Sequence, residues 1–427
     1  MAEIAAGALV AEQVLSTTIE GGVIAGYAVA QPTMPLKATF SQLAVTPDGD
    51  SLKRSHHTVS VVGDKAYIFG GEVASNKLAG NEVHIFSLNS NADAQYSCIP
   101  ALPLSDGGAI LSPRAGHTAI VDRNNRIVVF GGHDHKSEII DNLVYAFDTE
   151  EQKWSLYAQS QSSGSQVPAR TGAGAIYDAS KNLMIIVGGA ETAEHSSSSV
   201  FAIDLAGIDG WEALPDLPVA TKSPSVAFAN ETIWVVAGSS PLSSDVHSLS
   251  VHGGIEGSKT WRTVSFPTNP LAPGPRPRFA AGLLLVTTGY GRQYLLHFFG
   301  SRQHAQRQAA DEEADGREEG EPLYWSDMWT YQLPSAPLKP TGFADLVKPA
   351  AIKDAIRHKL GYDSGGESWA EVEVKADEQS AHEGKVHPGP RSYFGSAVMG
   401  DGRSIILWGG LNPRGEREGD GWVVRLE

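Results

Sequence analysis

The chain has 427 residues, of which 41% are hydrophobic, and its formal net charge is −16. This acidic balance argues against nucleic-acid binding through the general surface, because the phosphate backbone selects basic residues. The single cysteine, Cys98, excludes an internal disulfide, and no apolar run is long enough for a membrane span. The N-terminus lacks the basic start of a signal peptide, so we expect a reducing cytoplasmic location, with the nucleus as an alternative.

The first segment, residues 1–36, has a helical pattern over residues 3–30. Leu9 and Val14 belong to an apolar stripe with helical spacing, and the pattern breaks at Gly21. We expect a helical extension that packs on the flank of the following domain. The alternative is a helix for dimerisation or for a partner, with a purely structural or assembly role for the protein.

From residue 37 to residue 427, a short apolar run closed by glycine recurs six times. The copies occupy residues 66–71, 126–132, 183–189, 232–238, 294–300 and 404–410, and the fourth and fifth retain one glycine of the pair. Self-similarity at such a period is the signature of a repeat architecture.

The flanks of the copies match as well. Upstream lies a basic residue followed by small ones: Arg54, Arg114, Arg170, Arg278 and Arg391, with Lys222-Ser223-Pro224-Ser225 in the fourth copy. Downstream, residues 81–86, 141–148 and 326–331 predict a third strand, and Trp154, Trp211, Trp261 and Trp369 mark a fourth. The apolar second strand should be buried on both faces, whereas the alternating third strand should be half exposed.

Four strands per unit, with a double glycine after the second, resemble the kelch repeat of β-propellers. The resemblance covers about residues 37–427 and implies an all-β, six-bladed kelch propeller, with a distant likeness to nitrile-specifier-type kelch proteins. Residues 422–426 predict a third strand without a fourth, and residues 39–44 a fourth without the first three. Because an unpaired edge is a liability, we expect this N-terminal strand to close the last blade.

Blade five carries two predicted insertions, at residues 302–321 and 341–361. The first is acidic and nearly devoid of apolar side chains, which predicts a disordered loop. The second contains a short helical pattern that ends at Gly361. Insertions in one unit of a repeat array commonly decorate one face, often the binding face.

The kelch resemblance implies that the five repeat-start arginines gather around one mouth of the central channel, where kelch-type substrate adaptors hold acidic peptides. His57 and His117 follow two of these arginines and would share that mouth. A guanidinium is a rigid fork for carboxylates, and each charged hydrogen bond contributes roughly 1.5–3 kcal/mol. The alternative is that each arginine is a repeat feature that binds carbonyl groups of a neighbouring blade.

A weaker set of candidates lies just beyond one Gly-Gly pair. His133, His135 and Asp141 could hold a divalent metal, or they could be solvated loop residues. Nitrile-specifier proteins carry a Glu-x3-Asp-x3-His triplet as a proposed iron site. This chain has no complete triplet, since Glu191-x3-His195 lacks the middle carboxylate. We therefore expect no resident cofactor, with a divalent metal as the alternative.

The sequence contains no catalytic triad and no phosphate loop in its required context, so catalytic residues stay unassigned. Our leading hypothesis is a scaffold that binds a protein with an acidic segment through an Arg/His-lined mouth. The alternative is a stand-alone kelch enzyme or specifier that acts on a small metabolite, with or without a metal. The loop over residues 133–141 discriminates between them: facing the mouth together with His117 favours the enzyme, and pointing outward disfavours it.

Overall fold

The computed structural model describes residues 35–427 apart from several segments. These are residues 44–51, 89–95, 104–107, 109, 158–166, 193–194, 207–209, 237, 239–241, 252–259, 267–273, 289–290, 303–322, 335–365 and 376–385. The predicted helix over residues 3–30 and the insertions at 302–321 (apart from Arg302) and 341–361 lie outside the described residues. The described residues include no helix with the length and hydrophobicity needed to cross a bilayer.

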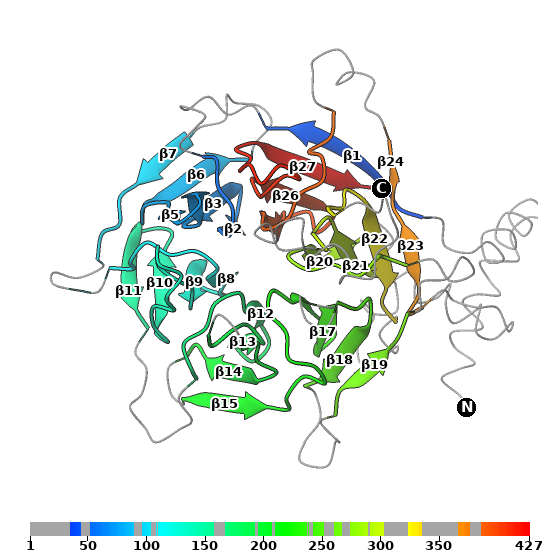
Figure 1. Cartoon of the computed structure of the whole chain (residues 1–427), viewed down its shortest axis with the longest axis horizontal. Coiled ribbons are helices and arrows are strands. Elements are labelled where there is room, and N and C mark those ends of the chain that lie inside the picture. Colours follow the sequence, from blue (N-terminus) through cyan, green and yellow to red (C-terminus); the bar gives the residue numbers. More distant parts are fainter. Residues whose placement is uncertain are drawn as a thin grey trace, which may run out of the picture.

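Six antiparallel sheets stand around a central axis (Figure 1). Blade one contains β2 (Thr58–Val62), β3 (Lys65–Phe69), β6 (Val83–Ser87) and β7 (Tyr96–Ile99), with the hairpin β4 (Glu72–Ala74) and β5 (Lys77–Leu78) beside it. Blade two contains β8 (Thr118–Val121), β9 (Arg126–Phe130), β10 (Val144–Asp148) and β11 (Lys153–Leu156), and blade three β12 (Gly174–Asp178), β13 (Leu183–Val187), β14 (Val200–Asp204) and β15 (Trp211–Leu214). Blade four contains β16 (Ser225–Ala229), β17 (Thr232–Val236), β18 (Val246–Ser250) and β19 (Arg262–Val264), and blade five β20 (Gly282–Thr287), β21 (Gln293–Phe298), β22 (Met328–Gln332) and β23 (Trp369–Glu371). The predicted all-β, six-bladed propeller is therefore confirmed.

The last blade joins the two ends of the described chain. It contains β25 (Gly395–Val398), β26 (Ser404–Trp408) and β27 (Gly421–Leu426), and its fourth strand is β1 (Lys37–Gln42). Strand β1 runs antiparallel to β27, with Ala38 opposite Leu426. The predicted closure by an N-terminal strand is confirmed. Beyond it, the short β24 (Glu373–Val374) pairs in parallel with β1 and covers its outer edge.

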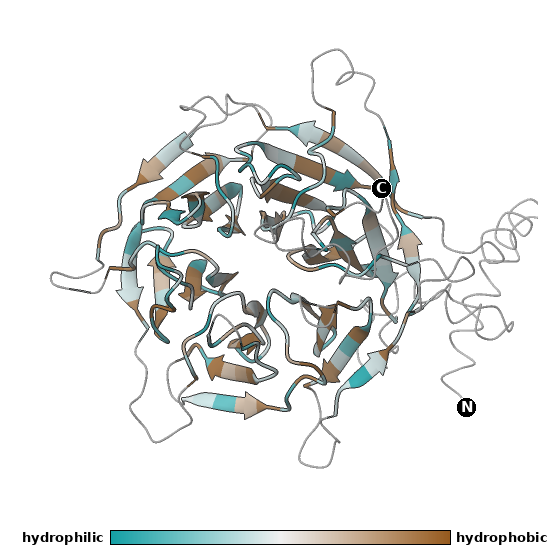
Figure 2. Ribbon diagram, in the orientation of Figure 1, coloured by the Kyte–Doolittle hydropathy of each residue, from teal (hydrophilic) through white to brown (hydrophobic). Residues whose placement is uncertain are grey.

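The core of the propeller is divided among the junctions between blades. Six clusters of buried hydrophobic residues each draw their side chains from two neighbouring blades. The innermost strands contact one another in cyclic order, which closes the ring. Figure 2 shows the hydrophobic colour concentrated on the inner strands of each blade. Since each blade buries its faces only against its neighbours, removing one blade would expose two of these clusters.

The burial of the strands agrees with the sequence-based prediction for the second strands and differs from it for the third strands. The second strands β3, β9 and β26 are buried on both faces, as predicted. The third strands β6, β10 and β22 are buried on both faces as well, so the expectation of half-exposed third strands was wrong for these three. Adjacent blades cover both faces of a third strand here, and its polar residues, such as His84, are buried with the rest.

Among the described residues, the last glycine of the double-glycine motif couples one blade to the next at five of the six junctions. The second glycine adopts φ near +100°, as at Gly132 (φ +106°), where a side chain is strongly disfavoured. The first adopts φ near +60°, which other residues tolerate, and in blade five Phe299 takes this place with φ +58°. This difference explains why the degraded fifth copy retains Gly300.

We expect Gly131→Val to destabilise the propeller by more than about 4 kcal/mol, because such values accompany clashes at special backbone positions. A β-carbon at Gly131 would stand 2.4 Å from the Arg170 carbonyl oxygen of the next blade. The matched control is Gly63→Ala, since Gly63 has φ +60° but no atom within 4 Å of an added β-carbon. Thermal unfolding of both variants is the measurement. A Gly131→Val variant as stable as Gly63→Ala would contradict the blade assignment.

Candidate functional site

The five repeat-start arginines are buried, with 0–1% of their surface exposed. Each guanidinium donates a hydrogen bond to the carbonyl at the first glycine position of its own blade. These are Arg54 to Gly70, Arg114 to Gly131, Arg170 to Gly188, Arg278 to Phe299 and Arg391 to Gly409, at 2.9–3.2 Å. This geometry is that of the alternative in which each arginine is a structural feature of the repeat. One detail differs from that expectation: the side chain binds a carbonyl of its own blade and not of a neighbouring one.

The charge of most of these arginines is compensated inside the blade. Arg114 pairs with Asp141 at 3.0 Å and Arg278 with Asp327 at 2.6 Å. Arg170 and Arg391 likewise meet Glu191 and Asp420, at 3.5 and 2.7 Å. In blade one, Arg54 contacts the imidazole of His84 at 2.9 Å, and burial lowers the pKa of Arg54 to about 10. These guanidinium groups face the blade interior and do not line the central pocket.

The backbone next to each arginine connects the blades. The second glycine of one blade donates its N–H to the carbonyl of the next arginine, as from Gly71 to Arg114 and from Gly132 to Arg170, both at 2.9 Å. Further in, the residues two positions beyond the arginines form a belt around the channel: His56, Gly116, Gly172, Ser223, Ala280 and Tyr393, all with φ between +49° and +63°. Head-to-tail N–H to C=O bonds of 2.7–3.2 Å connect them at five of the six junctions.

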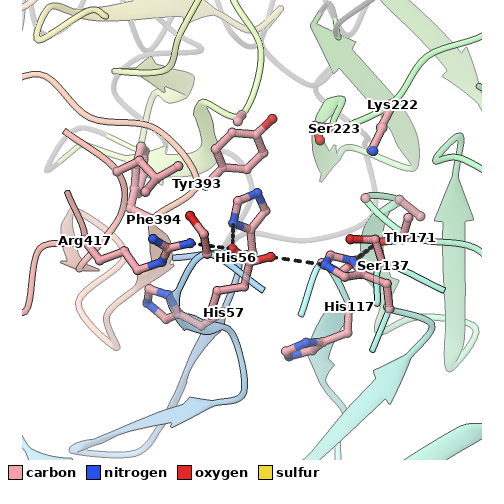
Figure 3. Close-up of a pocket in the computed structure, with 18 of the residues that line it drawn as sticks. His56, His57, His117, Ser137, Thr171, Lys222, Ser223, Tyr393, Phe394 and Arg417 are labelled. Carbon is pink, nitrogen blue, oxygen red and sulfur yellow. Dashed lines mark hydrogen bonds and ion pairs between the residues drawn. The ribbon is translucent and has the colours of Figure 1, made fainter. Parts of the chain in front are cut away.

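This belt corrects the alignment of the fourth repeat. The Thr221 carbonyl accepts from Gly189 N–H at 2.9 Å, as the arginine carbonyls do in other blades. Thr221 therefore occupies the arginine position, and Lys222 stands where other blades have Ser55, Thr171 or Phe279. Because of this shift by one residue, the Lys222 side chain enters the central pocket instead of the blade interior (Figure 3).

The pocket has a volume of about 440 Å³ and lies at the centre of the ring, where every blade contributes to its lining. Its polar groups come mainly from blades one, two, four and six (Figure 3). The residues that matter for its chemistry are His56, Glu72, His133, Lys222, Tyr393 and Arg417. Lys222 stands on the opposite side of the pocket from Arg417 (Figure 3).

Glu72 organises one side of the pocket. Its carboxylate accepts from Arg417 at 2.7 Å and lies 3.4 Å from His133 Nε2. Burial raises the pKa of Glu72, but the hydrogen bond with His133, the nearby His56 and the pair with Arg417 outweigh burial and lower that pKa to about 2. Glu72 is therefore ionised at neutral pH and neutralises Arg417.

The histidines of the mouth are packed into the wall. His56 stacks on Tyr393 with ring centroids 3.9 Å apart, and burial lowers its pKa to about 4. His117 contacts the Thr58 hydroxyl at 2.9 Å, and burial lowers its pKa to about 3. Burial also takes the pKa of His57 well below its usual value. His57 and His117 line the pocket as the sequence suggested, but as neutral, nearly inaccessible rings.

The three metal candidates are not brought together. His133 faces the pocket and contacts Thr171, whereas His135 is 64% exposed beside Asp134. Asp141 accepts from Arg114 inside blade two. Among the described residues, no group of three His, Cys, Asp or Glu side chains is arranged to hold a metal ion. The loop over residues 133–141, which was expected to separate the scaffold hypothesis from the enzyme hypothesis, is thus divided. His133 lies at the mouth beside His117, whereas His135 points outward.

Residues 56–287, more than half of the chain, match the KLHDC2/KLHL20/DRC7 Kelch-repeats domain. The chain belongs to the kelch-repeat family. This kelch propeller is similar to the solved structure of YjhT, with a TM-score of 0.54 and 12% sequence identity. The match covers 88% of this chain and 97% of that one. At this identity the likeness shows the fold alone.

Curated relatives match the kelch propeller over shorter stretches. An N-(sulfonatooxy)prop-2-enimidothioate sulfolyase of Thlaspi arvense is 30% identical over 111 residues, which cover 26% of this chain and 29% of that protein. A leucine-zipper-like transcriptional regulator 1 homolog of Drosophila melanogaster is 27% identical over 219 residues, which cover 50% of this chain and 21% of that protein. The chain thus spans less than a third of either relative.

Sequence reasoning missed the groups that line this propeller's mouth most directly. Glu72 and Arg417 come directly or shortly after two Gly-Gly pairs, where the chain crosses the mouth, and Tyr393 is two residues beyond Arg391. The signal that could have found them is position. The residues one to three places after the arginine position line the mouth in every repeat, and residues that follow the double glycine line it in blades one, two and six.

We expect Asp327→Ala to destabilise the protein by about 3–5 kcal/mol, since it leaves the buried Arg278 uncompensated. The double variant Arg278→Leu/Asp327→Leu should recover most of this loss, because it removes the buried charge. Denaturant unfolding measures both. As a surface control, Lys375→Ala breaks an exposed pair with Glu427 and should cost less than about 1 kcal/mol. Equal losses in all three would show that Arg278 is not a buried structural charge.

We expect stability to fall as the pH drops below 6.5. The folded pKa values of His56 and His117, about 4 and about 3, lie below the 6.5 of the unfolded chain. The unfolded state therefore binds more protons in this window, so stability is fully present above pH 6.5 and is lost toward pH 4. Each histidine adds up to about 1.4 kcal/mol per pH unit. His117→Gln should flatten the dependence of the unfolding free energy on pH, whereas the exposed His135→Gln should not; an unchanged slope in His117→Gln would contradict this.

Proposed function

We propose that this protein is a kelch-repeat binding module whose central mouth holds an anionic segment of a partner protein. The observation that carries the proposal is the charge of the mouth. Among its described lining residues, Glu72 is the only carboxylate, and Arg417 and His133 engage it. Lys222 adds a further cation without a carboxylate beside it in the described part of the chain.

The contrast with the rest of the molecule supports this proposal. The chain as a whole carries a net charge of −16, so a positive site at the channel mouth is surrounded by a protein that repels anions elsewhere. Such an arrangement suits recognition of a short acidic segment at one position and disfavours long polyanions along the surface. The aromatic pair of His56 and Tyr393 adds a flat apolar surface beside the charged groups.

The buried arginines have a different part in this proposal from the one the sequence suggested. Arg54, Arg114, Arg170, Arg278 and Arg391 would act through the backbone that they hold, and the direct contacts would come from Lys222 and from Arg417. Arginine-to-alanine variants are poor probes of binding for this reason, because each removes a buried structural group. Variants of the mouth itself are better probes.

A second candidate function is a specifier or enzyme that acts on a small anionic metabolite. Two observations favour it: the pocket volume of about 440 Å³ is in the range of small-molecule sites, and a relative over 111 residues is named as a sulfolyase. His133 at the mouth is the residue to test for a proton-transfer role, with or without a metal. Native mass spectrometry of the purified full chain, searched for a bound metabolite or metal, checks this candidate.

We place the protein in the cytoplasm, with the nucleus as an alternative, as part of the same proposal. Cys98 is a free, exposed thiol in a chain with one cysteine, which suits a reducing compartment. Fluorescence microscopy of the tagged full chain in its own cells is the direct measurement.

We expect Lys222→Glu to lower the recovery of a specific partner by about tenfold or more, because charge reversal adds repulsion to the lost attraction. The measurement is quantitative affinity purification with the full chain, followed by a titration of the recovered partner. Lys65→Glu is the matched control, since Lys65 is exposed at the end of β3 remote from Gly70. A partner retained equally by both variants would place its binding site elsewhere on the propeller and reject the mouth.

A further inference from the structure

The junction of blades four and five differs from the other five. Elsewhere, each belt residue donates its N–H to the belt residue of a neighbouring blade. Here, the described residues show no bond from Ala280 N–H to the Ser223 carbonyl, and none from Gly238 to Arg278. The blades remain joined at this junction by their shared hydrophobic core and by the Ser225 hydroxyl, which donates to the Ala281 carbonyl at 3.0 Å.

The interruption leaves hydrogen-bonding groups at the pocket wall. Ala280 N–H has no acceptor among the described residues, and Ala280 lines the pocket together with Ser223 and Lys222. An amide N–H without an acceptor at a partly enclosed wall is a ready donor for a ligand oxygen. The belt gap is thus a place where the propeller presents a donor to the pocket instead of to itself.

Lys222 lines the same pocket wall from blade four, with its stem on the side of blade three. Its stem packs on Gly172 of the neighbouring blade: a β-carbon at Gly172 would stand 3.2 Å from Lys222 Cγ and 3.2 Å from Ser223 Oγ. Burial lowers the pKa of Lys222, and no carboxylate in the described part of the chain acts against this effect. A partly buried ammonium without a counter-ion gains from an anion more than a solvated one does, because part of its hydration is already lost.

We propose that the pocket wall from Gly172 to Ala280 is an oxyanion subsite, in which the Lys222 ammonium, the Ser223 hydroxyl and the Ala280 amide N–H bind one carboxylate, sulfate or phosphate group. The inference rests on the proposed function and specifies which part of the mouth contacts the anion. A side-chain carboxylate of an acidic peptide and a small sulfated or phosphorylated molecule share this chemistry, so the test separates these sources. Arg417 lies on the other side of the pocket and is already bound to Glu72, so it is not part of this subsite.

The test is isothermal titration of the full chain at low ionic strength with sodium sulfate, sodium phosphate and an acetylated, amidated tetraglutamate peptide. We expect one anion per chain, at least tenfold weaker binding in Lys222→Met, binding within about threefold of wild type in Lys222→Arg, and a smaller loss in Ser223→Ala. Lys65→Met is the surface control and should bind as wild type does. Because Met retains the stem on Gly172, the unfolding temperature of Lys222→Met should not fall, which shows that the variant is folded.

The outcomes separate this inference from the proposed function. Preference for the peptide supports a protein source, and preference for inorganic sulfate or phosphate supports a small-molecule source. Equal binding by wild type and Lys222→Met, or no binding of any probe by wild type, overturns the subsite. If the subsite binds anions through Lys222 while Lys222→Glu still recovers every partner, the subsite stands and the proposed protein-binding function fails. If no probe binds but Lys222→Glu loses a partner, the subsite fails and the proposed function stands.

Discussion

The interaction on which the rest of this propeller depends is the hydrogen bond from the second glycine of one blade to the arginine carbonyl of the next. It requires a backbone with φ near +100°, which glycine alone adopts readily, and it places two blades in contact at the channel. The arginine side chain completes the arrangement by binding the first glycine's carbonyl in its own blade. The arginine thus binds the end of the second strand of its own blade through its side chain, and the previous blade through its backbone carbonyl.

This double use explains why a charged residue is conserved within the chain at a position with almost no solvent exposure. A buried guanidinium is costly unless its charge and its donors are satisfied, and here a carboxylate or an imidazole of the same blade satisfies it. The function that such arginines suggest from the sequence is recognition of anions. In this molecule their position makes them part of the frame, so we propose that the residues next to them carry the recognition.

The residues just after the arginine and just after the double glycine line the mouth. Their side chains are not fixed by the bonds between blades, so their identity differs from repeat to repeat. In most blades these positions hold small or neutral residues, so the few charged ones determine the character of the pocket. Glu72 and Arg417 neutralise each other, which leaves Lys222 as the group that gives the mouth its sign. A binding module and a small-molecule specifier would use the same surface, and the size of the ligand is what separates them.

The sequence by itself determined the repeat, the six blades and the closure by residues near position 39. These follow from local rules, namely strand periodicity, the backbone freedom of glycine and the need to pair an edge strand. Only the tertiary structure decided which side chains enter the channel. A shift of one residue moves a side chain from the blade interior to the pocket, as the difference between Thr221 and Lys222 shows, and no local pattern specifies that register. Nor could spacing predict that Glu72 meets Arg417, because 345 residues separate them and ring closure alone brings them together.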